Sequence, residues 1–145
     1  MNETTASVHW EGQGQAGHGQ VSTESWALKN QAYGLASRFE GDRRGSNPEE
    51  ILAAAHAACF TQTFSFACDR AGFATVSIDT QAKVRLARED DGFVIDRIAL
   101  SIQAHVPGIG DAAFQQLAAA AKRDCAVSKA LAGVPDIALV ATLRG

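Results

Sequence analysis

The sequence lacks a strong excess of either charge, a long uninterrupted apolar run and any low-complexity tract. Its 13 Lys and Arg residues and 16 Asp and Glu residues leave a formal charge of −3. Because such a chain has no general attraction for phosphate backbones, we expect no nucleic-acid partner. Residues 1–30 contain no segment typical of a signal peptide. The most apolar stretch, residues 51–68, is interrupted by polar side chains such as His56 and Gln62, so we expect no membrane span.

Cysteine and proline are also scarce, with three residues of each. Few cysteines and no leader argue against a secreted disulfide scaffold and for a reducing, cytoplasmic compartment. Cysteine chemistry in such a protein is expected to be reactive rather than structural. The prolines are scattered and no repeat is visible, so the 145 residues predict a single domain, 1–145, large enough to bury a core.

Periodicity and turn signals predict an α+β protein with antiparallel sheets packed around a long buried central helix. The expected order is a hairpin of strands at 7–12 and 21–26, a long exposed loop at 31–46, a helix at 48–70, strands at 75–86 and 93–106, helices at 112–123 and 125–132, and a strand at 137–143. Phe93 and Ile95 are out of phase with the alternation that begins at Ile98, which predicts a β-bulge near Asp96 and Arg97.

The central helix has clear start and stop signals. Asn47 can cap it, Pro48 suits the first helical position, and Glu50 is placed to reach back to the cap amide. Gly72 is expected to end it. Apolar residues lie all round this helix, which is typical of a helix enclosed by other elements.

Three side chains stand out as candidates for chemistry. Cys125 follows the polar run 122–124 at the start of a short helix, where cations and free backbone amides would stabilise a thiolate. Cys59 lies in mid-helix, where a free cysteine is most often a small buried apolar residue. His56, three residues before Cys59, is half of a possible metal site or Cys–His pair. No other histidine has ligand spacing, so a packing hydrogen bond is the favoured interpretation of His56.

Other polar and sulfur side chains have simpler interpretations. Arg38 and Glu49 flank the expected loop, and a solvated ion pair accounts for both. Cys68, near the end of the central helix, is interpreted as packing.

Several segments carry a family resemblance. They are Ser37-Arg38-Phe39-Glu40-Gly41, Gly45-Ser46-Asn47-Pro48-Glu49-Glu50 and His56-Ala57-Ala58-Cys59-Phe60. The most specific feature is the Asn-Pro-Glu helix start followed by Cys59, coupled to Cys125 just before a Val-Ser pair. Across essentially the whole chain the sequence resembles the OsmC/Ohr family of thiol-dependent peroxidases, and within it the OsmC branch.

The resemblance implies an intertwined homodimer with shared active sites that reduces organic hydroperoxides in oxidative or osmotic stress. Cys59 would be the peroxidatic thiol and Cys125 the resolving one. Arg38 would stabilise the Cys59 thiolate, and Glu49 would orient Arg38. The resemblance implies no flavin, haem or metal cofactor, and a dithiol reductant such as a lipoylated protein. Ala126 stands where the family usually has proline, which we expect to loosen the segment that carries Cys125.

The residue types suit this chemistry. Only a thiolate attacks a peroxide oxygen well, and arginine supplies a permanent positive charge that a carboxylate can hold by two hydrogen bonds. A second cysteine can trap the sulfenic acid as a disulfide, which an external dithiol then reopens. Phe60 and Phe64 are expected to provide apolar walls for an alkyl or fatty-acyl hydroperoxide.

Helix geometry adds a hypothesis about where the site lies. On one straight helix, the ten residues between Glu49 and Cys59 span about 15 Å along the axis. Glu49 therefore should not reach the Cys59 of its own helix, even through Arg38. We expect Arg38 and Glu49 of one subunit to complete the site around Cys59 of the other.

Two alternatives of other classes stay open. A Cys-His hydrolase or thioesterase would use Cys59 with His56 and would not need Cys125. A non-enzymatic protein that binds apolar ligands would leave both thiols unreactive towards peroxide. Fold-level likeness by itself does not separate these possibilities.

Overall fold

The computed structural model describes residues 1–145 and divides into two compact units, Met1–Ile51 and Leu52–Gly145. The division falls within the long helix, whose first residues belong to the first unit. The expectation of a single domain stays a prediction.

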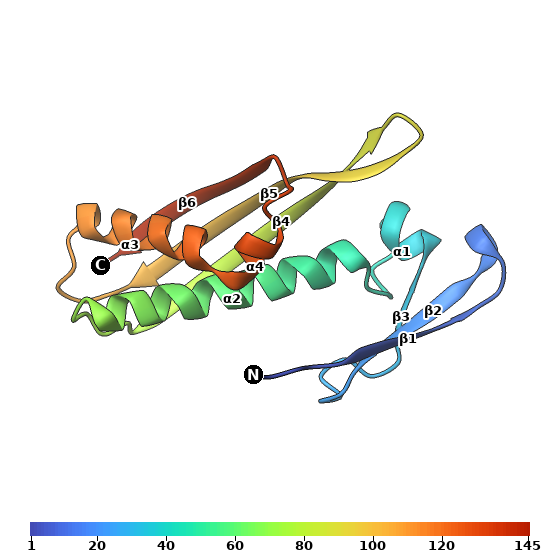
Figure 1. Ribbon diagram of the computed structural model, residues 1–145, viewed down its shortest axis with the longest axis horizontal. Coiled ribbons are helices and arrows are strands. Elements are labelled where there is room, and N and C mark those ends of the chain that lie inside the picture. Colours follow the sequence, from blue (N-terminus) through green and yellow to red (C-terminus); the bar gives the residue numbers. More distant parts are fainter. The chain divides into compact units, whose positions relative to one another are not determined.

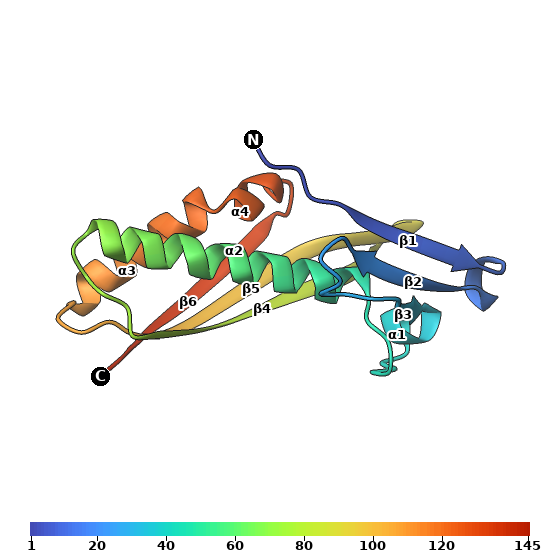
Figure 2. The same ribbon diagram turned by 90° about the horizontal axis from the view of Figure 1, so that it is seen from below.

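The first unit is built on a three-stranded antiparallel meander, seen in Figure 2 as the strands β1, β2 and β3. β1 (Ala6–Glu11) and β2 (His18–Thr23) are joined through a 3-10 turn at Gly14–Ala16. The Trp10 and Tyr33 rings lie 5.7 Å apart, centroid to centroid, and a Cβ at Gly19 would overlap both rings. Glycine is therefore required at this position of β2, opposite Trp10.

The segment 31–46 is not the featureless loop that the sequence predicts. It begins with β3 (Gln31–Gly34), which pairs with β2, and continues as the short helix α1 (Leu35–Phe39). Ser37 Oγ accepts a hydrogen bond from the Gly34 amide at 3.0 Å and ties the start of α1. The prediction was wrong because a strand and a helix this short contain too few residues to show a period. The consequence is that Arg38 projects from a helix rather than from a loop.

The long helix α2 (Pro48–Arg70) has the expected bounds. The Glu50 amide donates to Asn47 Oδ1 at 2.7 Å, which confirms Asn47 as the cap. The Glu50 carboxylate does not complete a capping box but accepts a hydrogen bond from Ser46 Oγ at 2.7 Å. At the other end, Gly72 has a φ of +89° and the Phe73 amide donates to the Cys68 carbonyl, so glycine ends the helix in a Schellman motif.

The second unit contains a sheet of β4 (Ser77–Glu89), β5 (Gly92–His105) and β6 (Asp136–Arg144), in that order. β4 and β5 form the expected long hairpin. Their register shifts where Arg85 pairs with Arg97 and Leu86 with Ile95, which confirms the predicted bulge at Asp96.

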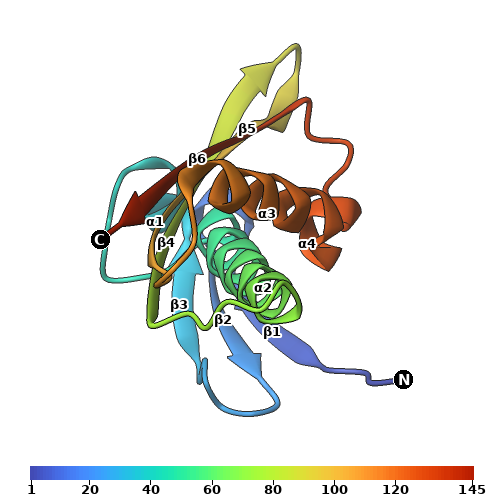
Figure 3. The same ribbon diagram turned by 90° about the vertical axis from the view of Figure 1, so that its left-hand side faces the viewer.

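The pairing of the last strand corrects the prediction of purely antiparallel sheets. β6 runs parallel to β5 along its whole length, from Arg97–Asp136 to His105–Arg144. Between them the chain forms α3 (Asp111–Asp124) and α4 (Ala126–Ala130). Parallel neighbours need such a crossover, so the helices between the two strands were the signal for parallel pairing. In Figures 1 and 3, α2 and α3 lie on one side of this sheet.

The core of the second unit lies between the sheet and these helices. Phe64 of α2 stacks with Phe60, at 6.4 Å between centroids, and meets Phe114 of α3 edge-on at 5.5 Å. The sheet contributes the alternating set expected from the sequence: Ile98, Leu100, Ile102, Ala104 and Val106. The α+β class with a long helix at its centre is thereby confirmed.

The helix α2 is buried on one face only within this chain. His56, Phe60, Phe64 and Cys68 are buried, whereas Ala54, Ala58 and Phe66 are exposed. A single sheet and one neighbouring helix cover one side of a cylinder, so the expected enclosure is incomplete. By length and composition alone α2 could cross a membrane, a test that the core helix of a soluble protein also passes. Its buried aromatic face against the sheet favours the core-helix interpretation.

The start of α2 can be tested through Asn47, which both caps the helix and donates from Nδ2 to the Ser37 carbonyl at 3.0 Å. We expect Asn47→Ala to lower the free energy of unfolding by about 1–2 kcal/mol because both bonds are lost. Asn47→Asp keeps the side-chain oxygen that accepts the cap hydrogen bond, so its free energy of unfolding should fall by less. Urea unfolding of both variants measures the difference, and equal losses would contradict a separate contribution of the cap.

Candidate active site

Two of the three cysteines come together in the second unit. Cys59 lies half-buried in the middle of α2, and Cys125 is fully buried at the junction where α3 ends and α4 begins. All three cysteines are free thiols. The crossover between β5 and β6 therefore brings Cys125 to α2, although the two cysteines are far apart in the sequence.

The surroundings of Cys59 favour its thiolate. Burial tends to raise the pKa of Cys59, but hydrogen bonding with the Cys125 thiol and with the backbone N–H groups of Val127 and Ala126 lowers it, and the net pKa is below the ordinary value. The Thr63 hydroxyl contributes in the same direction. These donors surround a mid-helix sulfur that sequence position alone suggested was inert packing.

Cys125 and Cys68 have the opposite tendency. Burial, and then the hydrogen bond to Cys59, raise the pKa of Cys125, and burial raises the pKa of Cys68. The expectation that cations and free helix amides would stabilise a thiolate at Cys125 is wrong, because its net pKa is raised. The backbone amides of Ser128 and Val127 do lower the pKa of Cys125, but burial outweighs them, and neither Lys122 nor Arg123 contributes to the shift.

Ala126 is the first residue of α4, so the missing proline does not prevent this turn from forming. Cys125, its N-cap, has an extended ψ of 126°. Alanine also keeps a backbone N–H that proline lacks, and this N–H is one of the groups that lower the pKa of Cys59. The substitution thus adds a donor at the sulfur.

Arg38 and Glu49 form a bidentate ion pair within the first unit. Arg38 Nη2 donates to Glu49 Oε1 at 2.7 Å, and Arg38 Nε donates to both carboxylate oxygens, at 3.1 Å to Oε1 and 3.3 Å to Oε2. The Glu49 side chain is 11% exposed and that of Arg38 37%. A nearly buried carboxylate is stabilised only when it is paired, so this is a positioned guanidinium rather than the solvated ion pair that the sequence suggested.

His56 pairs with neither cysteine nor a metal. Its Nε2 lies 2.7 Å from Ser128 Oγ of α4, with both residues buried. Burial lowers the pKa of His56. No group of three or more His, Cys, Asp or Glu side chains is arranged to hold a metal ion. The expected packing hydrogen bond exists, but its partner Ser128 had no signal in the sequence because it lies far along the chain on another helix.

The apolar space in the structure is not where the sequence suggested. Phe60 and Phe64 are fully buried in the core and cannot form a substrate wall. In the first unit, a cavity of about 360 Å³ is lined by apolar side chains together with Arg38: Trp10, Tyr33, Leu35 and Phe39.

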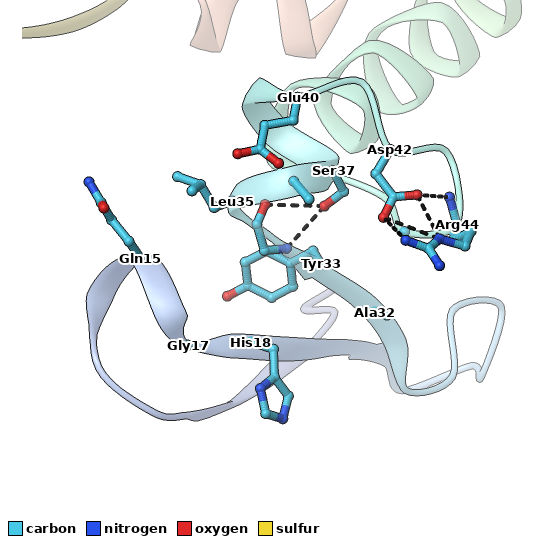
Figure 4. Close-up of a pocket in the computed structure, with 13 residues that line it drawn as sticks. Gln15, Gly17, His18, Ala32, Tyr33, Leu35, Ser37, Glu40, Asp42 and Arg44 are labelled. Atoms are coloured by element: carbon cyan, nitrogen blue, oxygen red, sulfur yellow. Dashed lines mark hydrogen bonds and ion pairs between the residues drawn. The ribbon is translucent and has the colours of Figure 1, made fainter.

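A neighbouring hollow of about 560 Å³ on the same unit is shown in Figure 4. Tyr33, Leu35 and Ser37 line it, and the Arg44–Asp42 ion pair lies at one side. The tethered Arg38 therefore projects from a unit whose aromatic side chains can hold an alkyl group.

Comparisons with known proteins agree on one family. The sequence model described as OsmC-like protein matches residues 40–140. Peroxiredoxin OsmC of Escherichia coli strain K12 is 49% identical over 124 residues, which cover 86% of each chain. The crystal structure of an organic hydroperoxide resistance protein OsmC from Legionella pneumophila has a TM-score of 0.75 and 25% identity over 98% of each chain.

A second solved structure, the organic hydroperoxide resistance protein OhrB of Bacillus subtilis, superposes with a TM-score of 0.67 and 25% identity. It covers 97% of this chain, and 98% of the OhrB chain is covered. The two compact units thus match known structures as one continuous chain.

The dependence of Cys59 on its neighbour can be tested by alkylation. We expect Cys125→Ala to raise the pKa of Cys59, because the thiol donor is lost, and to slow its reaction with iodoacetamide at neutral pH. Cys125→Ser keeps a hydroxyl donor, so the pKa and the alkylation rate of Cys59 should stay closer to those of the unmodified protein. Peptide mass mapping at a series of pH values gives the rate of alkylation at each cysteine. Cys68→Ala is the control. An unchanged Cys59 profile in Cys125→Ala would refute the role of this donor.

Proposed function

The chain belongs to the OsmC-like family, and on that premise we propose that it is a thiol-dependent peroxidase that reduces organic hydroperoxides to alcohols in oxidative or osmotic stress. The observation that carries the proposal is the sulfur of Cys59, whose pKa is lowered by the start of α4 and which lies next to a second thiol. A thiolate with a nearby thiol supports both peroxide attack and disulfide formation.

The reaction has two steps at the cysteines. The Cys59 thiolate attacks the outer oxygen of the hydroperoxide, the O–O bond breaks, and the alkoxide leaves as an alcohol after taking up a proton. Cys59 then carries a sulfenic acid. Cys125 attacks that sulfur, a disulfide forms and water leaves. An external dithiol reopens the bond by thiol exchange, and we propose a lipoylated protein as its source.

Arg38 and Glu49 are proposed to complete the site. A guanidinium is permanently charged, and its bidentate bond to Glu49 fixes its direction. In this role Arg38 stabilises the Cys59 thiolate and the charge that develops on the leaving oxygen. The apolar cavity beside Arg38 supports a hydroperoxide with an alkyl group over hydrogen peroxide.

We further propose a homodimer in which the site is shared. Glu49 and Cys59 are on one helix, and their ten-residue separation corresponds to about 15 Å along its axis. The exposed apolar face of α2, with Ala54, Ala58 and Phe66, supports contact with a second copy of the chain. Both units together are proposed to form one domain, and a cytoplasmic location suits thiols that must be reduced after each turnover.

The hydrolase alternative is less well supported. A Cys-His hydrolase needs histidine within hydrogen-bond reach of the nucleophile. His56 Nε2 is engaged by Ser128, and no histidine contributes to the pKa shift of Cys59. The lowered pKa of Cys59 also disfavours the alternative of a non-enzymatic binding protein, whose thiols would be unreactive.

A single-turnover experiment tests the peroxidase. With one equivalent of an organic hydroperoxide, we expect the loss of two thiols and a linked Cys59–Cys125 peptide. Cys59→Ser should abolish the reaction, whereas Cys125→Ser should stop at oxidised Cys59. Cys68→Ala is the matched control and should behave as the unmodified protein. Survival of all three thiols would reject the proposal.

Subunit exchange tests the shared site. Homodimers of Cys59→Ser and of Arg38→Ala should each be inactive. Mixing them allows a heterodimer in which one of the two sites combines an intact Cys59 with an intact Arg38, so we expect each heterodimer to regain about half the activity of the unmodified dimer. Confirmed exchange without any recovery would place Arg38 and Cys59 of one site in the same subunit.

A further inference from the structure

The buried pair of His56 and Ser128 has no place in the mechanism described above. The His56 side chain is fully buried. Its Nε2 is hydrogen-bonded to Ser128 Oγ at 2.7 Å, and its Nδ1 has no hydrogen-bond partner. An imidazole satisfied on only one side in a protein interior carries a cost, because a buried polar atom without a partner loses its hydration. Such an atom needs an explanation beyond packing.

The serine in this pair is also close to the resolving cysteine. Cys125 precedes α4 and Ser128 lies one turn further along the same helix. The Ser128 hydroxyl and its backbone N–H both interact with the Cys125 sulfur. Ser128 thus lies between the imidazole of α2 and the sulfur of Cys125.

We propose that Ser128 and His56 form a relay that accepts the thiol proton of Cys125 while Cys125 attacks the sulfenic acid of Cys59. This inference rests on the proposed peroxidase function. Once Cys59 carries a sulfenic acid, its thiolate no longer accepts from Cys125; the Cys125 thiol then donates to Ser128 Oγ, and the Ser128 hydroxyl donates to His56 Nε2. After transfer, Nε2 carries a proton and donates to Ser128, whose hydroxyl then donates to the Cys125 thiolate.

The properties of the two end groups explain why such a relay is needed. Burial, and then the bond to Cys59, raise the pKa of Cys125, so its attacking thiolate is scarce at neutral pH. Burial lowers the pKa of His56, so its ring is neutral and able to accept a proton there. The titratable groups on its own helix face are Cys59 and Glu49, and Cys125 precedes α4, the helix that contacts it. No charged side chain contributes to the pKa shift of His56.

The step balances without any further reactant. An electron pair of the Cys125 sulfur forms the S–S bond, and the S–O bond of the sulfenic acid breaks with its pair on oxygen. Hydroxide leaves and takes up one proton to become water. The proton held by His56 is released in exchange, so the sum is sulfenic acid plus thiol giving disulfide plus water. Cys125 is oxidised and the Cys59 sulfur is reduced.

His56 and Ser128 are positioning residues in this scheme, because neither touches the hydroperoxide. The competing interpretation is that the His56–Ser128 hydrogen bond is a structural tie, meaning that it only holds α2 and α4 together. Loss of such a tie would affect folding and would slow both sulfenic acid formation and resolution. A relay would affect resolution alone and would change its dependence on pH, so the two interpretations can be separated.

The experiment follows both steps in the full-length protein after one equivalent of tert-butyl hydroperoxide. Trapping with dimedone measures how fast the Cys59 sulfenic acid forms, and acid quenching with peptide mapping measures how fast the Cys59–Cys125 disulfide appears. The variants are His56→Gln and, as the smaller change, Ser128→Ala. His105→Gln is the matched control, a half-buried histidine at the end of β5 that does not contribute to the pKa shift of either cysteine.

For the relay we expect sulfenic acid to form at the unmodified rate in both variants. Resolution at pH 7 should slow by about a hundredfold, the lower end of what a positioned base contributes. In the unmodified protein, resolution should fall only at acidic pH, where His56 becomes protonated. In the variants the rate of resolution should increase steadily with pH, because Cys125 must ionise without the relay. The difference in rate between the variants and the unmodified protein should therefore become smaller in alkaline solution.

Three outcomes decide the matter. Unchanged resolution and pH profile in Ser128→Ala and His56→Gln would overturn the relay. An equal slowing of both steps with an unchanged pH profile would establish the structural tie instead. Absence of both the sulfenic acid and the Cys59–Cys125 disulfide in the unmodified protein would reject the proposed peroxidase itself, which is a different failure from the loss of the relay.

Discussion

A thiolate in a partly buried site exists only when enough donors surround it, and this constraint organises the second unit. Burial on its own would hold Cys59 in its neutral form. The opposing groups are the Cys125 thiol and the first amides of α4, which lie far from Cys59 in the sequence. The reactivity of one side chain on α2 therefore depends on how α4 is brought to it.

The crossover between β5 and β6 supplies that placement. Because the two strands are parallel, the chain must return along the sheet through α3 and α4, and Cys125 lies at the bend between these helices. Phe114 and Phe64 pack α3 against α2 in the core. The packing that stabilises the unit is thus also what positions the two sulfurs and the His56–Ser128 pair.

The buried polar side chains of each unit find their partners within that unit. Arg38 is held by Glu49 through two donors, and His56 by Ser128. A buried carboxylate and a buried imidazole both need partners, because an unpaired polar group in an interior is costly. The one buried side-chain polar atom left without a partner, His56 Nδ1, belongs to the residue that contacts Ser128, close to Cys125.

The sequence by itself determined the features that depend on neighbouring residues or on a recognisable pattern. These are the helix cap at Asn47, the end of α2 at Gly72, the β-bulge at Asp96, membership of the OsmC-like family, and Cys59 and Cys125 as the candidate reactive cysteines. Only the tertiary structure decided the short elements at 31–39, the parallel direction of β6, and that Cys59 rather than Cys125 has the lowered pKa. Local signals act over a few residues, whereas a pKa and a strand direction depend on groups that meet only when distant segments pack together.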